Sequence, residues 1–120
     1  MTTANLKVDC TLSNEHFEDI LDTSGMAIGY WASRASIEFV DEDSEELIYR
    51  VKERDGAEFV LTKADIEASL RDIIEGTFET SHSLQQEFAG FCLDKDQGDL
   101  DAESVDTLIQ LACFQEVIYG

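Results

Sequence analysis

The chain has 120 residues, a length that suits one domain around one hydrophobic core and is too short for two. Apolar residues make up 43% of it, enough to build that core, which excludes a fully disordered chain. The 27 Asp and Glu against 8 Lys and Arg give a formal net charge of −19, which excludes direct binding to nucleic acid or anionic lipid and favours basic partners.

The N-terminal part is expected to form a strand followed by a helix. Residues 5–12 (NLKVDCTL) alternate apolar and polar side chains, which is typical of a strand. From Ser13 the apolar spacing becomes helical, with Ser13 as N-cap and with Leu12 and Phe17 as a hydrophobic staple. We expect Gly25 to end this helix.

An antiparallel meander is expected next. The stretch GMAIGYWASRASIEFV predicts a strand with a bulge near Gly29, and residues 47–53 (LIYRVKE) predict a second. Asp55-Gly56 is a strong hairpin signal, after which EFVL returns as a further strand.

The second half of the chain reads as helical. Thr62 is expected to cap a helix that Gly76 ends, with Asp65 in a capping-box position. Residues 84–93 predict a short helix, and Asp101 is expected to cap the last one.

The apolar end of the chain, residues 117–119, is expected to be tied down as a short strand or by packing against the sheet. The predicted fold class is therefore α+β. We expect a single domain over residues 1–120, with an antiparallel meander of three to four strands packed against three to four helices.

Two acidic loops are the candidate partner-binding site. The stretch FVDEDSEELIYR lies between two predicted strands, and DKDQGDLD precedes the last helix. Counted from Asp94, the glycine is fifth and Val105 twelfth, whereas a calcium loop needs glycine sixth and glutamate twelfth, so we predict no metal site. The safest interpretation is a solvated turn that deters edge pairing of strands for the first stretch, and a solvated loop leading into an N-cap for the second. The functional interpretation is a contact surface for a basic partner. The residues assigned to that surface are Asp41, Glu42, Asp43, Glu45, Glu46, Asp94, Asp96, Asp99 and Asp101.

Zinc and catalytic motifs are absent from the sequence. It contains no CxxC or HxxxH pair, nucleophile elbow, phosphate-binding glycine loop or H-E-x-x-H. We therefore predict no catalytic residues, no cofactor and no enzymatic activity, and we expect the three widely spaced cysteines to be reduced and mostly buried. With neither a secretory signal nor a membrane span in the sequence, we expect a cytoplasmic protein. The residues considered for zinc or for nucleophilic chemistry are Cys10, His16, His82, Cys92 and Cys113.

The stretch GYWASR places Tyr30, Trp31 and Arg34 close together in sequence. Two aromatic rings with an arginine are suited to line a pocket or to anchor a partner. The same residues also suit a corner of the core in which Trp31 packs beneath the helices. We favour the core interpretation and keep the pocket as an alternative.

Two segments of the chain carry a resemblance to a known family. Residues 29–32 (GYWA) follow the first predicted helix, and residues 110–120 (QLACFQEVIYG) close the chain. This arrangement resembles a family of small uncharacterised bacteriophage and prophage proteins, which carry a YW-A-like motif and an ending such as ALFGEVVYG. Gln115 stands where that family usually has a glycine. The resemblance implies phage origin and no established activity.

These observations favour a non-enzymatic phage protein that binds and inhibits a basic host protein. Its acidic composition resembles that of DNA-mimicking inhibitors of the anti-CRISPR or anti-restriction type. We expect such a protein to act in the cytoplasm of the host cell. A homodimer through the C-terminal segment is a further expectation. The alternative is a protein that binds or sequesters a nucleotide, and the third class is an enzyme with Cys or His chemistry.

Overall fold

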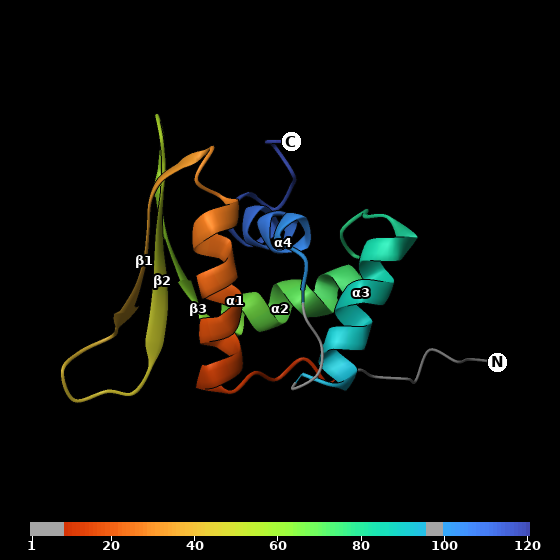
Figure 1. Cartoon of the computed structure of the whole chain (residues 1–120), viewed down its shortest axis with the longest axis horizontal. Helices are drawn as coiled ribbons and strands as arrows, with labels where there is room; N and C mark the ends of the chain where they lie inside the picture. Colours follow the sequence, from red (N-terminus) through yellow and green to blue (C-terminus); the bar gives the residue numbers. More distant parts are fainter. Residues whose placement is uncertain (1–8, 96–99) are drawn as a thin grey trace.

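The computed structural model describes residues 9–95 and 100–120, which form an α+β fold as predicted. Three strands make one antiparallel sheet in the order β1-β2-β3. Figure 1 shows all four helices on the same side of this sheet, so no described helix covers its outer face. The elements are α1 (Asn14–Ala27), β1 (Ala32–Phe39), β2 (Leu47–Glu53), β3 (Glu58–Thr62), α2 (Lys63–Ile74), α3 (His82–Leu93) and α4 (Ala102–Phe114).

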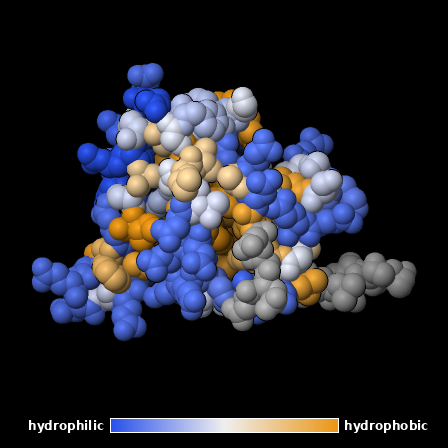
Figure 2. Space-filling view, in the orientation of Figure 1, coloured by the Kyte–Doolittle hydropathy of each residue, from blue (hydrophilic) through white to orange (hydrophobic). Residues whose placement is uncertain are grey.

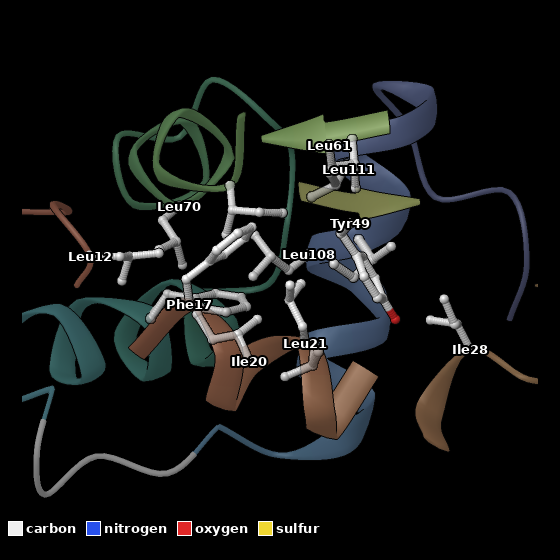
Figure 3. Close-up of a cluster of buried hydrophobic side chains, with 14 of the residues drawn as sticks. Leu12, Phe17, Ile20, Leu21, Ile28, Tyr49, Leu61, Leu70, Leu108 and Leu111 are labelled. Atoms are coloured by element: carbon white, nitrogen blue, oxygen red, sulfur yellow. The ribbon is translucent and has the colours of Figure 1, made fainter. Parts of the chain in front are cut away.

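The core lies between the inner face of the sheet and the helices. Figure 3 shows Phe17 of α1, Tyr49 of β2 and Leu108 of α4 among the side chains that converge there, and each of the three is at most 1% exposed. The one polar atom that Tyr49 brings into the core is satisfied, because its hydroxyl and that of Ser24 lie 2.9 Å apart.

The meander is the part of the fold that the sequence predicted best. Tyr49 lies opposite Ile37 on one side and Leu61 on the other, so the alternating apolar residues of all three strands face the helices. Residues 54–57 form the predicted turn between β2 and β3, which Glu53 closes by donating its N–H to the carbonyl of Ala57.

The first predicted strand is wrong where the structure describes it. Residues 5–8 lie outside the described residues, and residues 9–12 form no strand. The alternation is instead used by an extended segment that buries Cys10 and Leu12, and the Leu12 N–H donates to a carboxylate oxygen of Glu67 at 2.7 Å. The alternation thus marks side chains that are buried, Cys10 and Leu12, but no strand pairs with this segment in the described sheet.

Two predicted boundaries also shift. Helix α1 continues past Gly25 to Ala27, because Ser24 and Ile28 are both fully buried and their packing outweighs the cost of a helical glycine, about 1 kcal/mol. The bulge lies between Ala32 and Arg34 rather than near Gly29.

The helix caps follow the sequence closely. Ser13 accepts the N–H of His16, and Thr62 and Asp65 form the full capping box of α2. Asp101 stands at the N-cap of α4, but its side chain makes no capping bond; its own N–H donates to Glu87 at 2.9 Å. Helix α3 begins two residues before the predicted start, with a Ser81 cap.

The chain end packs against the sheet side of the core instead of forming a strand. Tyr119 stacks on Trp31 with ring centroids 5.4 Å apart, and its hydroxyl donates to Glu53. The buried Gln110 of α4 fixes the backbone there, because its side-chain oxygen accepts the N–H groups of Ile118 and Tyr119, each at 2.9 Å. The two segments behind the family resemblance, residues 29–32 and 110–120, thus meet in space.

Replacing Gln110 with alanine should release the chain end. The substitution leaves two backbone N–H groups without their acceptor and removes a buried side chain, so we expect a loss of about 2–4 kcal/mol in the free energy of unfolding. Urea denaturation measures that loss, and amide exchange at residues 118–119 reports the release. Gln86→Ala, at an exposed position of α3, is the matched control and should change neither.

Gln115 ends α4 in the left-handed conformation, with φ 64°. A side chain there costs roughly 1 kcal/mol, which explains why a glycine suits this position. Gln115→Gly should therefore raise the free energy of unfolding by about 1 kcal/mol. Thermal melts of the two proteins measure this gain. Glu75 ends α2 with an ordinary φ of −79°, so Glu75→Gly should give no such gain in the same measurement. Equal shifts in the two variants would contradict this explanation.

Candidate acidic interface

The first acidic loop is an ordered turn between β1 and β2. Val40 donates its N–H to the Glu46 carbonyl at 2.9 Å, and Asp41 accepts the N–H of Asp43 at 2.9 Å. The side chain of Asn14, the first residue of α1, donates to the Glu45 carbonyl at 2.8 Å and ties the turn to that helix. The turn is thus held in place by a backbone hydrogen bond, by the Asn14 amide and by one of its own carboxylates, that of Asp41.

The carboxylates of this turn are free to meet a partner. All five are exposed, and those of Glu42, Asp43, Glu45 and Glu46 make no hydrogen bond or ion pair within residues 9–95 and 100–120. Asp41, Glu42 and Glu45 line a hollow of about 490 Å³ whose apolar wall is Phe39, a side chain that is 63% exposed. Charge beside an exposed ring is suited to a Lys or Arg side chain.

Helix α1 adds four exposed carboxylates that the sequence analysis did not assign to the site. They recur at helical spacing on the side of α1 opposite its buried residues. The amphipathic pattern of this segment in the sequence could therefore have predicted that they share one exposed face. Figure 2 shows hydrophilic residues over the region where the turn projects and across the lower front of the molecule. The four residues are Glu15, Glu18, Asp19 and Asp22.

The second acidic loop is described only at its ends. Asp94 and Asp101 are exposed, whereas Asp96 and Asp99 lie outside the described residues. Asp101 borders a groove of about 710 Å³ whose other wall carries Asp19 and Asp22 of α1. The structure therefore brings this end of the second loop next to the α1 carboxylates. We call the turn, the four α1 residues and Asp101 the acidic interface.

Other carboxylates already make hydrogen bonds or ion pairs within the fold. Glu87 accepts the hydroxyl of Ser104 at 2.6 Å as well as the N–H of Asp101. Glu38 lies 3.2 Å from the Arg50 guanidinium, and hydrogen bonds from Ser36 and Arg50 lower the pKa of its carboxyl. The net charge thus overstates the number of carboxylates that make no contact within the fold.

The three residues considered as a pocket do not line one cavity. Trp31 is 1% exposed and donates its indole N–H to Asp106 at 2.8 Å, which fits the core interpretation. Tyr30 is 52% exposed, donates its hydroxyl to the same carboxylate at 2.5 Å, and borders a groove of about 430 Å³ that neither Trp31 nor Arg34 lines. Arg34 lies opposite Lys52 on the open face of the sheet.

The three cysteines are reduced thiols in the core or at its border. The sulfurs of Cys10 and Cys92 lie 3.7 Å apart, and Cys113 is half-buried. Burial raises the pKa of Cys92 and of Cys113 to about 12, so both stay protonated near neutral pH, a state unsuited to nucleophilic attack. His16 lies 2.9 Å from the Ser13 hydroxyl at the start of α1, and His82 is exposed at the start of α3.

The described parts of the chain hold neither a cluster of metal ligands nor a membrane-spanning helix. Within residues 9–95 and 100–120, no three His, Cys, Asp or Glu side chains are grouped to hold a metal ion. None of the described helices is both long enough and apolar enough to cross a bilayer.

Comparison with known proteins gives no further guidance: no family model matches the chain, and no curated protein or solved structure is similar to it. The resemblance to the phage family therefore stays a prediction.

The buried thiols predict a loss of stability in alkali. Between pH 9.0 and about 12 the cysteines of the unfolded chain ionise, while Cys92 and Cys113 of the folded chain keep their protons. The unfolded state then binds fewer protons, so the free energy of unfolding falls as pH rises through this range. Urea denaturation at stepped pH measures the fall, and Cys113→Ser should make it shallower. A Cys113→Ser profile as steep as that of the unchanged chain would contradict the assignment.

Proposed function

We propose that the chain is a non-enzymatic acidic protein that binds a basic host protein and inhibits it by occupying the surface that otherwise binds nucleic acid. The observation that carries the proposal is the acidic interface. A rigid turn and the exposed face of α1 together carry nine carboxylates, and the Asn14 side chain joins the two elements. The resemblance to phage proteins extends the proposal to an anti-CRISPR or anti-restriction role in the cytoplasm of the host cell.

Physical chemistry favours this role in three ways. A dense row of fixed carboxylates repeats the charge of a phosphate backbone while offering no bases to read. Because the turn and α1 are ordered before a partner arrives, little conformational entropy is lost on binding. The long-range attraction also speeds encounter with a basic groove and weakens as salt is added.

A capture experiment with a matched control tests the proposal. The chain is immobilised, proteins bound from a lysate of the natural host are identified by mass spectrometry, and affinity for the purified partner is measured at rising salt. We expect affinity to fall steeply with salt and duplex DNA to compete. The test variant combines Asp41→Asn, Glu42→Gln, Asp43→Asn, Glu45→Gln and Glu46→Gln.

The control variant neutralises the same number of exposed carboxylates outside the acidic interface. We expect the turn variant to lose about ten-fold or more in affinity and the control variant to lose much less. Affinity that is flat in salt, or equal losses in the two variants, would overturn the proposal. The control variant combines Asp55→Asn, Glu75→Gln, Glu79→Gln, Glu103→Gln and Glu116→Gln.

The alternative of nucleotide binding is less well supported. The groove of about 710 Å³ has a suitable size, but Asp19, Asp22 and Asp101 line it and would repel phosphate groups, with Lys95 and His16 as their basic neighbours. A thermal-shift screen with nucleotides separates the two functions, because a bound nucleotide would raise the melting temperature.

A further inference from the structure

Strand β1 presents a free backbone edge. Only β2 pairs with it in the described sheet, and the pair formed by Val40 and Glu46 is hydrogen-bonded. Hydrogen-bonded and non-hydrogen-bonded pairs alternate along an antiparallel ladder, so the even-numbered residues 34–38 direct their backbone groups to β2. The N–H and C=O groups of residues 35, 37 and 39 therefore point away from the sheet.

The opposite edge of the sheet is shorter and partly closed. Strand β3 has five residues against eight in β1, and the N–H of Thr62 at its end is already donated to Asp65. An exposed row of unpaired backbone groups is a template for another strand, and β1 offers the longer row.

The charges of β1 are arranged with opposite signs at its two ends. Arg34 stands near the start beside Lys52 of β2, whereas Glu38 stands near the end, just before the acidic turn. Among the acidic groups at the basic end, Glu53 of β2 already accepts the Tyr119 hydroxyl, and Asp55 and Glu58 lie on the hairpin turn and on β3, farther from the edge. Strand β1 itself is neutral in a chain of net charge −19.

We propose that two copies of this chain pair antiparallel along the β1 edge and form a continuous six-stranded sheet. With the two-fold axis at Ser36, Arg34 of each copy lies opposite Glu38 of the other on the open face of the sheet. On the inner face Ala35 lies opposite Ile37 of the second copy, and their outward N–H and C=O groups complete the ladder. Pairs such as Arg34 with Glu38 are the non-hydrogen-bonded ones, in which side chains come closest.

The same two charges select this register. An in-register parallel pair would set Arg34 beside Arg34 and Glu38 beside Glu38. A two-fold antiparallel pair shifted by four residues would set either the two Arg34 or the two Glu38 side chains opposite each other. Arg34 makes no hydrogen bond or ion pair within the described chain, so it is available to the second copy. The side chain of Phe39, 63% exposed, would lie diagonal to Ala35 of the second copy, within reach of a large side chain.

A second copy is favoured over a foreign strand by this self-complementarity. Elsewhere the excess of carboxylates makes two copies repel each other, whereas the β1 edge pairs unlike charges twice by symmetry. The inference is independent of the proposed function, because the acidic interface need not be engaged for the edges to pair.

Two charge-reversal variants test the proposal. Arg34→Glu puts carboxylates opposite one another twice in a homodimer, and Glu38→Arg does the same with guanidinium groups, so each should dimerise about ten-fold or more weakly than the unchanged chain. An equimolar mixture should dimerise again, because each copy then meets an unlike charge at both positions. Sedimentation velocity at moderate salt measures the association.

Further variants locate the interface. Arg71→Glu makes the same change of charge on an exposed position of α2 and should leave the dimer intact. Ile118→Ser tests the alternative interface on the C-terminal segment and should also leave the dimer intact. The proposal is overturned if the unchanged chain is a monomer, if Arg34→Glu associates as Arg71→Glu does, or if the mixture stays monomeric.

Discussion

The indole of Trp31 is the contact on which the arrangement of the sheet and the helices depends. It follows α1 by four residues and precedes β1 by one, it packs on Phe114 of α4, and it stacks on Tyr119 at the chain end. Its N–H reaches Asp106, which also accepts a hydrogen bond from Gln110 at 3.0 Å. One buried ring thus joins the two halves of the chain. Gln110 accepts the N–H groups of Ile118 and Tyr119, which this packing brings close to the core.

A second constraint is the large excess of carboxylates over cations. Some of them are used internally as hydrogen-bond acceptors: Glu67 for the N-terminal segment, Asp65 for the start of α2 and Glu87 for the start of α4. Helix starts and irregular segments carry unpaired N–H groups, so an acidic chain can satisfy them with the residues it has most of. Nine exposed carboxylates lie on the turn and on α1, and others are spread over the rest of the surface. Strands β1 and β2 hold three of the cations on the open face of the sheet, Arg34, Arg50 and Lys52.

Local signals predicted most of the fold, and non-local packing decided the rest. The Asp55-Gly56 turn, the Thr62 capping box and the Tyr49 face of β2 depend on neighbouring residues, which the sequence displays directly. The state of residues 9–12 depends on whether a partner strand exists, and the end of α1 on the burial of Ile28. For the candidate site, the carboxylates of the turn were found as a run, whereas those of α1 are spread at helical spacing. The α1 carboxylates lie close to the turn because the Asn14 side chain donates to the Glu45 carbonyl. These two residues are about thirty positions apart, so no local sequence pattern predicts the contact.

The burial of Trp31 has a consequence for spectroscopy. It is the only tryptophan of the chain and lies 1% exposed against Tyr119, so its fluorescence reports the environment of one known place. Emission should shift to longer wavelength when water reaches the indole, as it would on detachment of the chain end. The acidic turn lies at the far end of β1 from Trp31, so contacts made there should leave the emission unchanged. The molecule therefore carries its own optical label for motions of the C-terminal segment, separate from events at its charged surface.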